Sequence, residues 1–167
     1  QGCVLDGSLD EFLDSPGIQP PSKRSSPTSE ELDAAKIFRR ASPAVSTVIS
    51  SFDADGQATA IGTGFAIGGG STVVTNAHVV TDTFEPAYEA SEIHLQREDG
   101  ARIRATVAGI DYHADIAVLD AEQSMTDQPL EFAKSKPETG DPVLAIGSPL
   151  GLTYTMSVGH ITGVDRT

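Results

Sequence analysis

The fold is decided by the stretch ATAIGTGFAIGGGSTVVT, residues 58–75. Its two ends predict strands, Ala58–Ile67 and Thr72–Thr75, because β-branched and aromatic side chains favour a pleated, half-buried surface. The glycines of Gly68–Gly70 predict a turn between them, since glycine adopts left-handed backbone conformations without steric cost. The stretch therefore predicts two strands joined by a glycine turn.

Further short strands are predicted on both sides of this stretch. Val45–Ile49 precedes it and is followed by a turn at Asp53–Gly56. Downstream, Ile116–Leu119 and Pro142–Ile146 are continuous apolar runs that predict buried strands, and Thr153–Val164 predicts one or two more. Short strands separated by glycine and proline turns, without a βαβ rhythm or internal repeats, predict an all-β barrel or sandwich.

An alternating pattern between these strands also predicts a register. Apolar side chains occupy odd positions and polar ones lie between them: Ile93, Leu95, Ile103, Ala105 and Val107. A two-residue turn at Asp99 and Gly100 would place Leu95 opposite Arg104, on the wrong face. A three-residue turn with Gly100 at positive φ keeps Leu95 opposite Ile103, and we predict that longer turn.

The N-terminal region differs in composition from the rest. Residues 1–27 contain four prolines and no sustained periodicity, which predicts a flexible tail or tether. Thr28 and Glu31 form a capping-box pattern that predicts the start of a short helix, and this helix should end before Pro43. Cys3 follows a glycine, as the lipid-bearing cysteine of a lipoprotein does. Lipidation at Cys3 would give a membrane tether, and the alternative is an ordinary surface thiol.

The composition excludes several classes of protein. The 167 residues contain 24 acidic and 11 basic side chains, for a formal net charge of −13, and one cysteine. One cysteine excludes an internal disulfide framework and a multi-cysteine zinc site. The acidic excess argues against a nucleic-acid partner, because phosphate contacts need clustered Lys and Arg. No window is long and apolar enough to span a bilayer. An Asp-rich, Lys-poor chain suits high salt, but an ordinary acidic protein has the same composition.

Two residues are candidates for catalytic chemistry. The chain has four histidines, and no two of them have a metal-ligand spacing. His78 directly follows the strand Thr72–Thr75, and Asp115 lies 37 residues later, where it opens an apolar run. A carboxylate entering a core needs a donor, and a histidine N–H would be a suitable one. Such a pair is what a hydroxyl nucleophile needs, whereas a turn or helix-capping role for Asp115 is the structural alternative.

Four motifs in collinear order resemble the HtrA (DegP-like) family of trypsin-like serine proteases. They are Gly62–Phe65, Val74–Val80, Asp115–Leu119 and Gly140–Leu152. The resemblance runs from about Ser42 to Arg166 and implies a chymotrypsin-like double β-barrel. It implies that His78 and Asp115 are two members of a Ser-His-Asp triad. By the same resemblance, residues 28–135 would hold the N-terminal helix and first barrel, and residues 136–167 the opening strands of a second barrel.

The resemblance also implies a function and a location. Members of the family are ATP-independent endopeptidases that act on unfolded proteins in the cell envelope, often as trimers with PDZ domains. An extracytoplasmic, homo-oligomeric serine endopeptidase without a cofactor is therefore expected.

The sequence departs from the family pattern at three places. Ser148 stands where the family usually has Asn, and the connection Asp53–Gln57 is short. The Gly-Asn-Ser-Gly-Gly motif that carries the family's nucleophile would come after Thr167, so we expect the 167 residues alone to be inactive. Two alternatives are a non-catalytic HtrA-like chaperone or binding module, and an acidic surface lipoprotein whose motifs match by chance.

Overall fold

The structure, a computed structural model, describes residues 33–53, 59–82, 88–148 and 154–164. The predicted tail at residues 1–27, Cys3, the capping box of Thr28 and Glu31 and most of the turn at Asp53–Gly56 lie outside the described residues.

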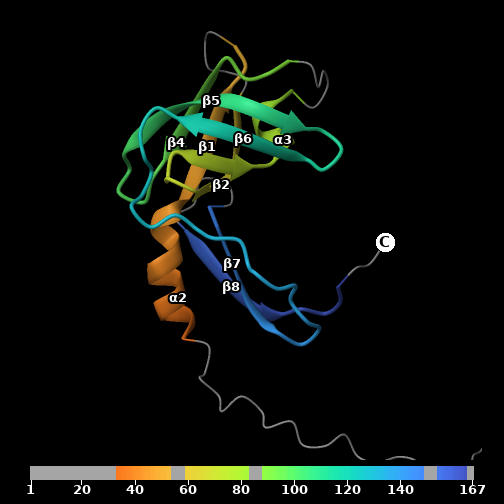
Figure 1. The fold of residues 1–167 in the computed structure, drawn as a ribbon. Helices are drawn as coiled ribbons and strands as arrows, with labels where there is room; N and C mark the ends of the chain where they lie inside the picture. Colours follow the sequence, from red (N-terminus) through yellow and green to blue (C-terminus); the bar gives the residue numbers. More distant parts are fainter. Residues whose placement is uncertain (1–32, 54–58, 83–87, 149–153, 165–167) are drawn as a thin grey trace, which may run out of the picture. The chain divides into compact units, whose positions relative to one another are not determined.

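A short helix, α2 (Ala34–Ala41), precedes the strands (Figure 1). Asp33 is its N-cap and accepts a hydrogen bond from the backbone N–H of Lys36 at 2.9 Å. It ends before Pro43, as predicted, although Ser42, the residue before that proline, keeps helical dihedrals (φ −57°, ψ −35°). The chain tightens there into a 3₁₀ turn, η1 (Ser42–Ala44).

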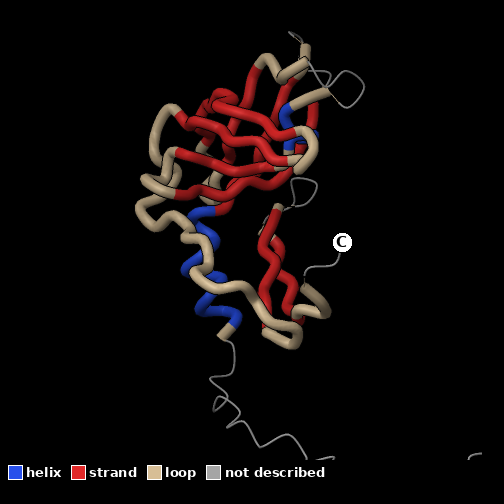
Figure 2. The backbone as a smooth tube through the Cα atoms, turned by 45° about the vertical axis from the view of Figure 1, so that its right-hand side comes forward, coloured by secondary structure: helices blue, strands red, loops and turns tan. Residues whose placement is uncertain are grey.

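Six strands of the described residues close into an antiparallel barrel. They are β1 (Val45–Ser51), β2 (Thr59–Ile67), β3 (Thr72–Thr75), β4 (Glu92–Gln96), β5 (Arg102–Asp111) and β6 (Ile116–Ala121). Their order around the barrel is β1-β2-β3-β6-β5-β4, and β1 pairs with β4 to close it. Figure 2 shows these strands side by side in one curved sheet. The all-β prediction is confirmed.

The predicted register of β4 and β5 is also confirmed. Leu95 pairs with Ile103, and Gly100 has a φ of 82°. The backbone N–H of Arg97 donates to the carbonyl of Ala101 at 2.9 Å, so three residues form the turn. The longer turn keeps the apolar side chains of both strands on one face of the sheet.

Small and branched aliphatic side chains fill the barrel. Its fully buried members include Val48, Val73, Val80, Leu95, Ala117 and Leu119. The expectation that Ile116–Leu119 is a buried strand is wrong for half of its residues, because burial alternates along β6 and Ile116 is 44% exposed. A barrel strand has one inner and one outer face, so half of an apolar run points outward.

Two more strands, β7 (Pro142–Gly147) and β8 (Thr155–His160), form an antiparallel pair. The segment predicted as one or two strands therefore has one strand in its described part. Ser148 follows β7, is 1% exposed, and accepts a hydrogen bond from Thr47 of β1 at 2.6 Å. The backbone N–H of Ser148 donates to Thr63 of β2 at 3.0 Å. These buried contacts tie the end of β7 to the outer face of the barrel.

Candidate active site

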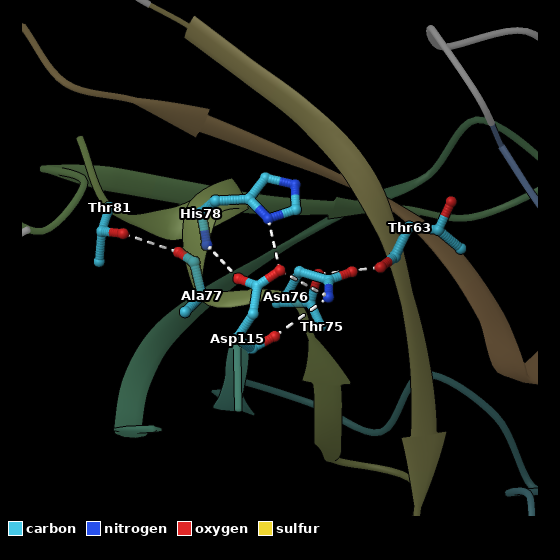
Figure 3. A network of polar contacts seen from close by, with 7 residues as sticks. All are labelled: Thr63, Thr75, Asn76, Ala77, His78, Thr81 and Asp115. Atoms are coloured by element: carbon cyan, nitrogen blue, oxygen red, sulfur yellow. Dashed lines mark hydrogen bonds and ion pairs between the residues drawn. The ribbon is translucent and has the colours of Figure 1, made fainter. Parts of the chain in front are cut away.

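His78 lies on a single helical turn, α3 (Ala77–Val80), directly after β3. The apolar residues on both sides of His78 explain this placement, because Ala77, Val79 and Val80 are buried while His78 points outward. The hydroxyl of Thr81 donates to the carbonyl of Ala77 at 2.8 Å, which closes the turn (Figure 3). The local sequence thus anchors α3 in the core and presents His78 at the surface.

The close packing of α3 on β2 depends on Gly62. A Cβ at this position would lie 2.8 Å from Cγ1 of Val79 and nearer still to Cγ2. Real Cβ atoms essentially never approach a neighbour this closely, so another residue at position 62 would displace α3 or Val79. The first glycine of the Gly62–Phe65 motif therefore sets the position of the helical turn that carries His78.

Asp115 lies in the turn between β5 and β6. A carboxylate oxygen of Asp111 accepts hydrogen bonds from the backbone N–H groups of His113 and Ala114, both at 3.0 Å, and so shapes this turn. Asp115 itself has a φ of 53°, in the left-handed region. Its side chain is 44% exposed, which corrects the expectation that the carboxylate enters the core.

The structure brings the two predicted site residues together. Nδ1 of His78 lies 2.8 Å from Oδ2 of Asp115, and the backbone N–H of His78 donates to Oδ1 at 3.0 Å. This backbone hydrogen bond is the main cause that lowers the pKa of Asp115 below its usual value, against a partial loss of hydration that raises it. The imidazole of His78 and the amide of Asn76 lower the pKa further. Asp115 is therefore an ionised acceptor at neutral pH.

The remaining histidines lie apart from this pair. His94 is on the polar outer face of β4, with Nε2 3.8 Å from a carboxylate oxygen of Glu92. His113 is exposed in the turn before Asp115, and His160 ends β8. Among the described residues, no group of three or more His, Cys, Asp or Glu side chains could hold a metal ion.

The geometry of the pair suits proton transfer. With a proton on Nδ1, the imidazole of His78 donates to Asp115, and Nε2 then carries the lone pair of a base. Figure 3 shows the second ring nitrogen turned away from Asp115. The His78 side chain is 59% exposed, so a reacting hydroxyl could reach Nε2.

Sequence reasoning missed one member of this network, Asn76. Its side-chain amide donates to the backbone carbonyl of Asp115 at 3.0 Å and to Oδ2 at 3.2 Å (Figure 3). The sequence shows only that Asn76 follows a strand and lies two residues before His78, a candidate base. Nothing in the sequence alone identifies its partner 39 residues away.

Comparison with known proteins places the chain in a family. Residues 62–167 match the model of the trypsin-like peptidase domain. The chain belongs to this family. Within it, the similarity to HtrA-type and DegP-like proteases predicted from the four motifs is confirmed, and the fold is the all-β chymotrypsin-like fold.

The curated relatives are longer proteins. A probable periplasmic serine endoprotease DegP-like from Chlamydia pneumoniae is 39% identical over 63% of this chain, and one from Halomonas elongata is 36% identical over 64%. The chain spans about one fifth of the length of these relatives, 20% and 21% respectively.

Solved structures show the same fold. The serine endoprotease from Yersinia pestis is 30% identical with a TM-score of 0.65, over 80% of this chain and 45% of that one. The HtrA-type protease AlgW with tripeptide is 27% identical with a TM-score of 0.68, over 80% of this chain and 41% of that one.

Proposed function

We propose that the protein is a serine endopeptidase of HtrA type in which His78 is the general base and Asp115 orients it. The observation that carries this proposal is the 2.8 Å contact between Nδ1 of His78 and Oδ2 of Asp115, with Nε2 turned away from the carboxylate. His78 would take the proton of a serine hydroxyl as its oxygen attacks a peptide carbonyl. It would then return that proton to the leaving amine.

The nucleophilic serine would come from polypeptide outside the 167 residues. Ser148 does not suit this role, because its side chain is buried and hydrogen-bonded to Thr47. In this proposal residues 28–135 carry the helix and first barrel, and residues 136–167 begin the second barrel. The oxyanion hole would accompany the serine, so the 167 residues alone should be inactive.

The expected substrates are unfolded polypeptides, and the expected location is extracytoplasmic. Support comes from the relatives, which are named periplasmic serine endoproteases. A homo-oligomer, a trimer in the family, and a lipid tether at Cys3 belong to the same proposal. Within the described residues, no helix has the length and hydropathy needed to cross a membrane. The net charge of −13 argues against a nucleic-acid partner.

Two variants of the full-length protein test the proposal with casein as an unfolded substrate. H78A should lose nearly all turnover, and D115N should lose most of it, because the imidazole would no longer be held in the reactive tautomer. H94Q is the matched control, since His94 lies on the outer face of β4 and should be dispensable. Wild-type turnover in H78A would refute the proposal. A wild-type protein that binds casein without cleaving it would indicate the non-catalytic chaperone instead.

A further inference from the structure

One side chain outside the His78–Asp115 pair binds both the backbone and the side chain of Asp115. The amide of Asn76 donates to the backbone carbonyl of Asp115 at 3.0 Å and to Oδ2 at 3.2 Å. We propose that Asn76 is a positioning residue that sets the Asp115 carboxylate against the imidazole of His78. This inference rests on the peptidase function proposed above.

Helix capping does not account for Asn76. An asparagine at an N-cap normally accepts a hydrogen bond from a backbone N–H one turn into its own helix. Asn76 is the N-cap of α3, but its side chain makes no such bond. Oδ1 of Asp115 accepts the backbone N–H of His78 instead, at 3.0 Å. The carboxylate has taken the capping role, and the Asn76 amide is directed at that carboxylate.

The backbone of Asp115 also needs support. Among the described residues it is the one non-glycine residue with positive φ. A left-handed conformation is strained for most L-residues, although Asp tolerates it better than most. The hydrogen bond from Asn76 to the Asp115 carbonyl opposes relaxation of this conformation. Because the same amide also binds Oδ2, the side chain and the backbone of Asp115 are fixed relative to each other.

The consequence for the proposed reaction lies in the tautomer of His78. Oδ2 of Asp115 receives two donors, Nδ1 of His78 and Nδ2 of Asn76. Without the second donor, the carboxylate can rotate away and hold the proton on Nδ1 less firmly. Small displacements in a reacting geometry cost about a hundredfold in rate, so we expect kcat of N76A to fall about tenfold to a hundredfold. KM should be unchanged, because the substitution changes the tautomer of His78 and not the binding of the substrate.

The experiment uses the full-length protein and four variants. Steady-state kinetics on casein gives kcat and KM for N76A and N76D, and the ¹⁵N shifts of the His78 ring give the fraction of neutral imidazole protonated at Nδ1. N76D keeps the shape of Asn76 but places a second carboxylate against Asp115, so at neutral pH it should be slower than N76A. Q96A is the control for loss of an amide, since Gln96 binds Arg102 on the outer face of the barrel. H78A reports on the proposed function itself.

Lower kcat and a smaller Nδ1-protonated fraction in N76A, with wild-type values in Q96A, would support the inference. Loss of thermal stability in N76A with an unchanged tautomer and unchanged kcat would overturn it and leave a structural role. If N76A does not fold, N76D decides alone, and wild-type kcat in N76D would overturn the inference. Wild-type activity in H78A would reject the peptidase mechanism, whereas an inactive H78A with a fully active N76A rejects only the role of Asn76.

Discussion

The substitution Gly62→Ala should displace His78 although the added methyl group contacts Val79 and not His78. The added Cβ would lie 2.8 Å from Cγ1 of Val79, nearer to Cγ2 and 3.2 Å from Cβ. Val79 is 4% exposed and β-branched, so it has little room to change its χ1 rotamer. We therefore expect the single turn α3 to shift as a unit and to carry with it His78, the residue before Val79.

The size of the effect follows from two opposing contributions. Overpacking a core costs about 1–3 kcal/mol. Replacing a strand glycine by alanine returns about 0.5–1 kcal/mol, because the unfolded chain loses conformational freedom. Gly62 has no positive φ, so backbone strain adds nothing. We expect the unfolding free energy of G62A to fall by up to about 2.5 kcal/mol, and kcat on casein to fall about a hundredfold if His78 moves by 1 Å.

Calorimetry and casein kinetics on the full-length protein test this reasoning. The matched control is G109A, because a Cβ at Gly109 in β5 meets no atom within 4 Å. G109A should keep wild-type kcat and lose no stability. The double variant G62A/V79A removes the clashing methyl groups and should recover kcat, with a coupling energy of about 0.5–3 kcal/mol between the two sites. Wild-type stability and kcat in G62A would refute the clash. Loss of activity in G109A would show that the effect is not specific to position 62.

Three other expectations concern charge and buried polarity. Folding lowers the pKa of Asp115 below the unfolded value of 3.8. The stabilisation that Asp115 contributes is therefore present above that value and is lost as the pH falls through the folded pKa. Below pH 4, the urea midpoint should fall more in the wild type than in D115N. Burial raises the pKa of Tyr154 to about 12, and its hydroxyl donates to the carbonyl of Val45 at 2.9 Å. Its stabilisation is present below the unfolded pKa of 10 and declines towards pH 12, so Y154F should show a smaller loss of stability over that interval. The hydroxyl of Ser50 is buried without a hydrogen-bond partner among the described residues, so S50A should raise the unfolding free energy by about 1 kcal/mol or more, and a lower midpoint in urea would contradict this.

The parts of the fold that the sequence predicted depend on short-range rules. The register of β4 and β5 follows from the parity of the apolar positions and from one glycine, Gly100, that can adopt positive φ. The cap of α2 depends on one hydrogen bond between the side chain of Asp33 and the backbone of Lys36, and several residue types cap helices well, so local propensity alone does not select Asp33. The exposure of Ile116 does not follow from the sequence, because an apolar run does not show whether its strand has one covered face or two.

The site shows a different limit of sequence reasoning. His78 after a strand and Asp115 at the start of an apolar run suggested a pair, and the resemblance to HtrA proteases selected this pair over other His and Asp residues. The exposure of Asp115 and its contact with Asn76 could not be predicted, because both depend on how the turn between β5 and β6 meets the end of β3. Contacts between residues 39 positions apart carry no local signal.

Two departures from local rules meet at this contact. Asp115 adopts a backbone conformation that favours glycine, and Asn76 leaves its own helix uncapped by its side chain. Each departure alone would cost stability, but together they form a closed set of hydrogen bonds in which Asp115 caps α3 and Asn76 supports Asp115. Sequences usually violate local preferences where geometry matters more than stability. The same hydrogen bonds hold Asp115 against the imidazole of His78, which is the geometry that the proposed role of His78 as a base requires.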